Sequence, residues 1–268
     1  MTTARWIALS LLLVICGAAV AANLLAPVPY AEQFRDLPGS PPSAKHWLGT
    51  DNLGRDRFSR VLYGSRVSLL LAPTAALIST LLAACIGGAA GFLGGRIQRL
   101  AMWTTDLFLS LPWLFLLLAV RALLPLNISP QLSAVVTFSL LGVLGWAASA
   151  RIICANSSSL RNSDFVLQAR ASGLKTPRVL AVHVLPNLAP VLLAQFWISI
   201  PAFILAEANL GMLGLGVAEP LPSWGSLLRE LQSYSALSFH LWQLVPLLLL
   251  ISVVTCLQIL LSNKELTA

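Results

Sequence analysis

The chain alternates long apolar runs with short polar segments. Six of the runs are long enough for a helix to cross the hydrocarbon core of a bilayer, which takes about 20 residues. They cover residues 6–25, 67–92, 101–124, 132–150, 188–210 and 242–261. This pattern predicts an all-α integral membrane protein with six transmembrane helices.

Composition supports this class. Hydrophobic residues make up 57% of the chain and charged residues only 10%, whereas a soluble domain carries about 25% charge. The net charge of +7 raises the question of nucleic acid, but the cations are spread over loops without a basic stripe interleaved with aromatics. We interpret them as cations that flank membrane segments. The four cysteines lie in or at the end of apolar runs, without metal-site spacing, and are predicted to be free.

The first apolar run resembles a signal peptide, because Arg5 precedes it and small residues follow it. It is long for a signal core, and the chain continues as a polytopic protein, so residues 1–26 are predicted to be an uncleaved transmembrane helix. Residues 27–66 then form an extracytoplasmic connector that starts with several prolines. From Asp56 onward we expect a short amphipathic helix at the membrane interface, with Phe58, Val61 and Leu62 on its apolar face. The alternative for the connector's charges is a solvated loop paired with itself.

Polar features inside the runs have competing interpretations. The glycines of residues 87–95 are typical of a close helix–helix approach; a phosphate loop is excluded because no Lys-Ser or Lys-Thr follows. Asp106 suggests a proton carrier or an interfacial structural acid, and the absence of a relay partner favours the second. Pro112 lies inside the third run, and Pro190 and Pro201 are expected to break the fifth.

Residues 162–190 are too rich in charge for lipid. Asp164 begins a helical pattern that stops at Gly173. Thr176 is predicted as the N-cap and Pro177 as the first helical residue of a second short helix that continues to Pro186. Neither helix is long enough to be stable alone in water. The segment therefore needs a partner surface, from its own membrane domain or from another protein.

Six crossings put both termini on one side of the membrane. The connector carries many cations, but it is long and partly neutralised by acids, and long loops count less than short ones for orientation. We therefore expect cytoplasmic termini, which also puts residues 162–190 in the cytoplasm.

This cytoplasmic segment resembles the EAA loop of binding-protein-dependent ATP-binding-cassette (ABC) importer permeases. The matching residues are Ala169, Gly173, His183, Leu185, Pro186 and Asn187. Two further stretches, GTDNLGRDRFSRVLYGSRVSL and AEANLGMLGLGVAEPLPSWGSLL, resemble the second permease subunit of the dipeptide, oligopeptide and nickel branch, so the similarity covers residues 44–265. The chain departs from the family pattern at Leu167, where the family has its glutamate, and at Gln168 and Ser172.

The resemblance implies a type I ABC importer permease with a core at residues 67–263 and a coupling loop at 155–187. The implied partners are ABC ATPase subunits, a homologous second permease, an extracytoplasmic solute-binding protein and lipid, in a bacterial inner membrane. The residues expected to couple to the ATPase are Asp164, Phe165, Gln168, Ala169, Arg170, Ser172, Gly173 and Pro186. Those expected to dock the binding protein are Gly49, Asp51, Gly54, Arg55, Asp56, Pro222 and Trp224.

No enzymatic chemistry is predicted for this chain. It has no Walker A lysine, and His46, His183 and His240 lie in different loops without metal-ligand spacing. No cofactor is expected on it, since ATP and Mg²⁺ would bind the partner subunits. A stand-alone secondary transporter is the main rival, with only Asp106 and Glu207 as intramembrane acids, and a membrane-embedded hydrolase is a weaker one. We expect di- or oligopeptides as cargo, with nickel or another small solute as the alternative.

Overall fold

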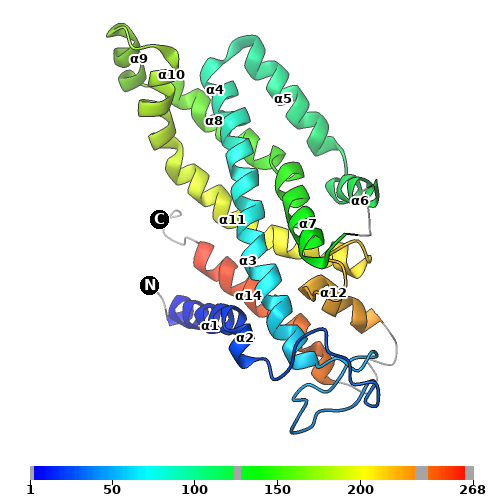
Figure 1. Ribbon diagram of the computed structural model, residues 1–268. Coiled ribbons are helices and arrows are strands. Elements are labelled where there is room, and N and C mark those ends of the chain that lie inside the picture. The colour runs from blue at the N-terminus through cyan, green and yellow to red at the C-terminus, as the bar shows by residue number, and fades with distance from the viewer. Residues whose placement is uncertain (1–2, 124–127, 233–240, 263–268) are drawn as a thin grey trace. The chain divides into compact units, whose positions relative to one another are not determined.

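The computed structural model describes residues 3–123, 128–232 and 241–262, and Figure 1 shows the helices in chain order. Within these ranges all regular elements are helical, apart from an isolated bridge between Thr50 and Asp56. The α-helices are α1 (Thr3–Val20), α2 (Ala22–Leu25), α3 (Arg57–Ala83), α4 (Ala89–Leu93), α5 (Gly95–Ser110), α6 (Trp113–Leu123), α7 (Pro130–Leu144), α8 (Ala147–Arg161), α9 (Asp164–Ala171), α10 (Thr176–Val179), α11 (Leu185–Met212), α12 (Trp224–Arg229) and α14 (Val245–Leu261). The prediction of an all-α protein is confirmed.

Among the described residues, four helical segments are long and apolar enough to cross a membrane: Thr3–Val20, Arg57–Leu93, Thr176–Met212 and Trp242–Leu261. The number rises to six if two bent helix pairs each count as one span, α5 with α6 and α7 with α8. The third predicted span is therefore not one straight helix. Its break lies at Leu111, whose backbone is extended (ψ 135°) because the following Pro112 disfavours the helical conformation of the residue before it.

The predicted interfacial helix from Asp56 is wrong as a separate element. Asp56 instead caps α3, accepting a hydrogen bond from the Ser59 N–H at 2.8 Å, and the helix continues into the membrane span through a π-helical turn at Ala84–Gly88. The sequence pattern predicted an apolar face in the membrane and an arginine face in water at the start of this helix. The arginines do not face water, because Arg57 and Arg60 are only 8% and 0% exposed.

The second short helix after Gly173 is also not separate. It starts at Thr176, with Lys175 rather than Thr176 as its N-cap, passes through a π-helical turn at Leu180–Val184 and continues as α11. Pro190 and Pro201 lie inside α11 and do not break it. The apolar length of the whole segment stabilises it in lipid more than two missing N–H donors destabilise it.

The chain divides into two compact units. The first unit comprises Met1–Ala72, Arg121–Phe138 and Pro201–Ala268, and the second comprises Pro73–Val120 and Ser139–Ile200. In the first unit α1 and α12 pack against α14, and in the second α4 and α5 pack against α8.

Glycines bring α8 into backbone contact with the end of the preceding span in the second unit. A Cβ on Gly87 would stand 2.3 Å from the Ala150 carbonyl oxygen, and one on Gly91 would stand 2.3 Å from that of Cys154. The Ser157 hydroxyl also donates to the Gly88 carbonyl at 2.7 Å. The predicted close helix–helix approach is confirmed, and it gives α9 a rigid support.

Candidate functional site

Helix α9 is a short, well-delimited helix directly after α8. Ser163 stands at its N-cap with extended backbone, and Asp164 lies in its first turn, where a negative charge complements the helix dipole. At the other end the Leu174 N–H donates to the Ala169 carbonyl at 3.2 Å and the Gly173 N–H to that of Arg170 at 3.0 Å. This is a Schellman cap, and it requires the left-handed backbone that Gly173 adopts (φ 79°). The predicted stop at Gly173 is confirmed.

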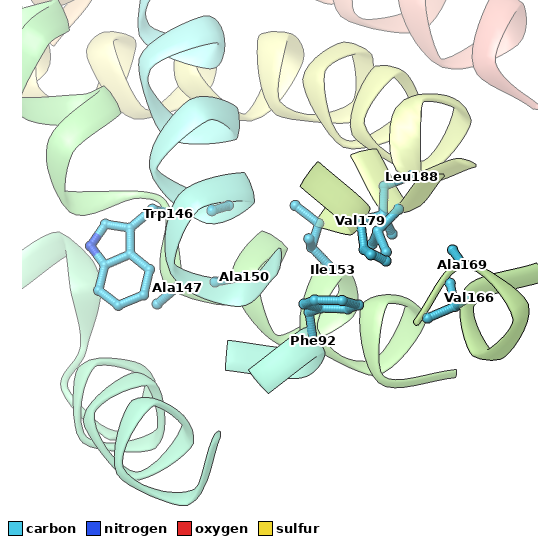
Figure 2. Close-up of a cluster of buried hydrophobic side chains, with 11 residues drawn as sticks. Phe92, Trp146, Ala147, Ala150, Ile153, Val166, Ala169, Val179 and Leu188 are labelled. Atoms are coloured by element: carbon cyan, nitrogen blue, oxygen red, sulfur yellow. The ribbon is translucent and has the colours of Figure 1, made fainter. Parts of the chain in front are cut away.

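One face of α9 is buried in its own unit. Val166 is 0% and Ala169 7% exposed, and both belong to a cluster of buried apolar side chains. Figure 2 shows them with residues from α4, α8 and the start of the α10–α11 segment, including Phe92, Ile153 and Val179. The partner surface that a helix of this length needs is therefore supplied in part by the protein itself.

The rest of the α9 surface is open. Phe165 is 37% and Leu167 50% exposed, on two sides of the helix, and Gln168 and Ala171 between them are exposed as well. Two exposed apolar side chains on a helix that also carries polar residues mark a surface suited to another protein. Leu167 thus belongs to this surface, although sequence reasoning treated it only as the position of a lost acid.

Arg170 joins α9 to the end of the second span. Its guanidinium carbon lies 4.8 Å from the centroid of the Phe92 ring, within the range of a cation–π contact. The ring is only 1% exposed, so the arginine covers the edge of the core.

The residues expected to couple to the ATPase therefore divide into two groups. Ala169 faces the interior of its own unit, where its small side chain permits α9 to pack closely. The others are exposed: Asp164, Phe165, Gln168, Arg170, Ser172, Gly173 and Pro186.

The first unit contains a network of charges that joins the connector to the segment after α11. Arg55 Nε donates to Asp51 Oδ2 at 2.6 Å, and the Arg55 guanidinium also pairs with Glu219. Arg60 Nη2 donates to Glu230 Oε1 at 3.0 Å, and Arg57 pairs with the same carboxylate at 3.1 Å. Arg60 further lies 3.5 Å from both Asp51 and Glu219.

Burial and pairing act against each other on the pKa values of this network. Burial lowers the pKa of Arg55, but the hydrogen bonds and charges of Asp51 and Glu219 outweigh it, so this pKa is raised. Burial raises the pKa of Glu219, yet Arg60 and Arg55 lower it below its ordinary value. For Glu230 burial prevails over Arg60 and Arg57, and the pKa is raised.

The residues expected to dock the binding protein lie inside the first unit rather than on its surface. Asp51, Asp56 and Trp224 are 2%, 0% and 0% exposed. The Trp224 indole N–H donates to the Ser65 hydroxyl at 2.9 Å. The remaining four are also buried: Gly49, Gly54, Arg55 and Pro222. Their neighbours Asn52 and Leu53 are exposed.

Sequence reasoning missed Glu219 and Glu230 as partners in this network, and it did not predict that the arginines are buried. The connector is paired, as the alternative interpretation had it, but its partners Glu219 and Glu230 come from more than 150 residues away and the arginines are not solvated. The one signal available was that the first motif-like stretch contains Arg55, Arg57 and Arg60, whereas Glu219 lies in the second and Glu230 just after it.

The two acids considered as intramembrane candidates, Asp106 and Glu207, each have a partner from another helix of the same unit. Asp106 pairs with Arg151, and both side chains are about half exposed. Glu207 is fully buried and accepts a hydrogen bond from the Ser68 hydroxyl at 3.3 Å. Each acid thus has a partner within its own unit.

Comparison with known proteins identifies the family. The sequence model of the family described as "Binding-protein-dependent transport system inner membrane component" matches residues 83–264. The chain belongs to this family. It is the inner-membrane component of an ABC importer of the dipeptide, oligopeptide and nickel branch; this component is not catalytic and binds no cofactor, since ATP binds the separate ATPase subunits.

Three relatives illustrate the branch. The permease is 36% identical over 236 residues to the dipeptide transport system permease protein DppC of Bacillus subtilis (strain 168), covering 88% of this chain and 72% of the relative. It is 34% identical to the oligopeptide transport system permease protein OppC of Mycobacterium tuberculosis (strain ATCC 25618 / H37Rv), over 92% of this chain and 84% of the relative. It is also 34% identical to the nickel transport system permease protein NikC of Escherichia coli (strain K12), over 87% and 83%.

Proposed function

We propose that this permease imports di- or oligopeptides, together with a homologous second permease, an ATPase pair and an extracytoplasmic solute-binding protein. The observation that carries the coupling role is the two-sided character of α9. Val166 and Ala169 anchor the helix in its own unit, while Phe165 and Leu167 remain exposed for the ATPase. A push on the exposed face would be transmitted to the unit through the anchored face, as a rigid-body movement.

The contacts within each unit agree with the proposed topology. If each bent pair is one span, three spans separate the connector from α9. The connector then shares a side with the segment after α11, and its arginines do pair with Glu219 and Glu230. In the same way α9 shares a side with the end of α4, and Arg170 does contact Phe92. We place the termini and α9 in the cytoplasm of a bacterial cell, and the connector outside.

Peptide cargo is supported by the relatives named for dipeptide and oligopeptide transport, and nickel by the nickel relative of similar identity. The test is uptake by proteoliposomes that contain the whole importer and its binding protein. We expect uptake of a radiolabelled di- or tetrapeptide that requires both ATP and the binding protein.

Two results would contradict the proposal in different ways. Accumulation of ⁶³Ni²⁺ without peptide would overturn the cargo but leave the permease role intact. Uptake that proceeds without ATP would overturn the coupled import itself and favour a secondary transporter. Omission of the ATPase subunits is the matched control.

A further inference from the structure

One side of α5 is exposed from its first turn to its last. Because an α-helix turns by about 100° per residue, Arg96, Leu100, Trp103 and Leu107 fall on the same side. The side chains of Leu100, Trp103 and Leu107 are 64%, 70% and 63% exposed, and Arg96 is exposed as well. We call these four residues, together with the adjacent and exposed Arg99, the α5 stripe.

The apolar part of the α5 stripe is suited to lipid rather than to water. Three large apolar side chains that lie together on a surface are unfavourable in water, and the chain is an inner-membrane component. Helix α5 belongs to one of the bent helix pairs that can form a span. Tryptophan is enriched where the hydrocarbon core meets the headgroups, so Trp103 marks this boundary and Leu107 lies on the hydrocarbon side of it.

The two arginines of the stripe then lie at the depth of the lipid headgroups. A helix rises by about 1.5 Å per residue, so Arg96 and Arg99 stand about 10 Å and about 6 Å from Trp103 along the helix axis. The headgroup region is about 5–8 Å thick on each side of the hydrocarbon core. A long arginine side chain reaches the lipid phosphates from either position.

The charges around these two arginines favour an anion. The second unit carries seven arginines and lysines but only two acids. The one acid of α5, Asp106, lies about two turns further along the helix and pairs with Arg151. Arg161 adds a further cation, because its guanidinium lies against Gly94 in the turn before α5. Within the described part of the chain, neither arginine of the stripe makes an ion pair.

We propose that the α5 stripe binds an anionic phospholipid, whose headgroup pairs with Arg96 and Arg99 and whose acyl chains lie along the three apolar side chains. A guanidinium forms strong hydrogen bonds with phosphate oxygens, and basic residues at a membrane surface attract anionic lipids. A zwitterionic headgroup also has a phosphate, but its own cation offsets the negative charge. A soluble anion fits less well, because it would leave the apolar half of the stripe uncovered.

The test measures quenching of Trp103 fluorescence by brominated lipids in nanodiscs that contain the intact importer. The chain has eight tryptophans, so the Trp103 signal is taken as the difference between a protein and the same protein with W103F. At equal mole fraction, we expect brominated phosphatidylglycerol to quench this signal at least about threefold more than brominated phosphatidylcholine.

Two double variants and one control show whether the arginines cause this preference. R96Q/R99Q should remove it, whereas R96K/R99K should retain most of it, because lysine also binds phosphate as a point charge. R35Q neutralises an exposed arginine of the connector, outside α5, and should leave the preference unchanged. Added salt should reduce the preference by screening the charges.

Three results would overturn the inference. A Trp103 signal that neither lipid quenches would show that a protein subunit covers the stripe. Equal quenching by the two lipids in wild type would show that no anionic lipid is selected, and an unchanged preference in R96Q/R99Q would show that other residues select it. None of these measurements depends on peptide import, so this inference and the proposed function can fail separately.

Discussion

The guanidinium of Arg170 lies over the ring of Phe92, 4.8 Å from its centroid. The arginine belongs to α9, the proposed contact with the ATPase, and the phenylalanine to α4, at the end of the span that begins at Arg57. This contact and the buried Val166 connect the exposed coupling helix to a membrane helix within one unit. A displacement of α9 would thus be transmitted through packed side chains.

Truncation of Phe92 should weaken this connection. F92A removes the ring of a residue that is 1% exposed and is expected to cost about 3–5 kcal/mol of stability. We expect the variant to insert into the membrane but to lose transport. The measurements are thermal unfolding of the purified complex and peptide uptake. F92L keeps most of the apolar volume and should lose much less stability and uptake. Equal unfolding temperatures and uptake rates in the two variants would show that the ring does not connect α9 to α4.

The neighbouring glycines Gly87 and Gly88 should differ sharply in how well they tolerate substitution by alanine. G87A places a methyl group 2.3 Å from the Ala150 carbonyl oxygen, whereas G88A meets only ordinary contacts at 3.9 Å from Ile153 and Leu188. We expect G87A to cost about 1–3 kcal/mol through overpacking and G88A to be close to neutral. Thermal unfolding of the two variants measures this, and a neutral G87A would contradict the close packing of α8.

Gly173 should tolerate only residues that adopt a left-handed backbone. Its φ is 79° and its Cβ position is open, so any cost comes from conformation, about 1–2 kcal/mol for an ordinary residue and more for a β-branched one. We expect G173V to insert into the membrane and permit ATP hydrolysis but to transport poorly, while G173N retains transport. Normal coupling of uptake to ATP hydrolysis in G173V would contradict the proposal that the left-handed turn at Gly173 is needed for coupling.

Cysteine crosslinking should distinguish the two faces of α9. Leu167 is 50% exposed and Ala169 is 7% exposed. L167C is expected to crosslink to a cysteine on the contact surface of the proposed ATPase partner, whereas A169C should not, because its side chain faces its own unit. The readout is the size of the crosslinked species on a denaturing gel. Crosslinks from A169C alone would contradict the assignment of the buried and exposed sides of α9. Crosslinks only to extracytoplasmic proteins would contradict the proposed cytoplasmic location of α9.

Glu219 should give the first unit an acid-sensitive component of stability. Arg60 and Arg55 hold the pKa of this carboxyl below its ordinary 4.5, although burial opposes them. A folded-state pKa below the unfolded one stabilises the protein in full above the unfolded value, and this contribution is lost as the pH falls through the folded value. The unfolding temperature of wild type should therefore exceed that of E219Q at neutral pH.

This difference should shrink as the pH falls below 4.5 and should vanish only where the carboxyl is protonated in the folded chain as well. Its size should be modest and should fall with added salt, because the Glu219 side chain is 54% exposed and solvent screens exposed pairs. A difference that grows on acidification would show that the pairing does not stabilise the folded state.

Local patterns in the sequence were sufficient for several features. The apolar runs predicted the spans because lipid requires about 20 apolar residues per crossing helix. Asp164 and Gly173 delimited α9 correctly, since capping depends on neighbouring residues. The spacing of Gly87 and Gly91 indicated close packing because only a missing side chain permits such an approach.

The features that the sequence did not reveal depend on partners far apart in the chain. A charge run in the connector reads as a solvated segment until Glu219 and Glu230 are brought beside Arg55 and Arg60. Likewise, Ala169 and Leu167 are both small-to-medium apolar residues on one short helix, and only the position of α8 decides which of them is buried. The sequence by itself determined which segments are apolar enough to cross lipid and where α9 begins and ends, because those choices depend on local chemistry. The tertiary structure decided which charges are buried and which face of α9 is open, because burial depends on which distant segments meet.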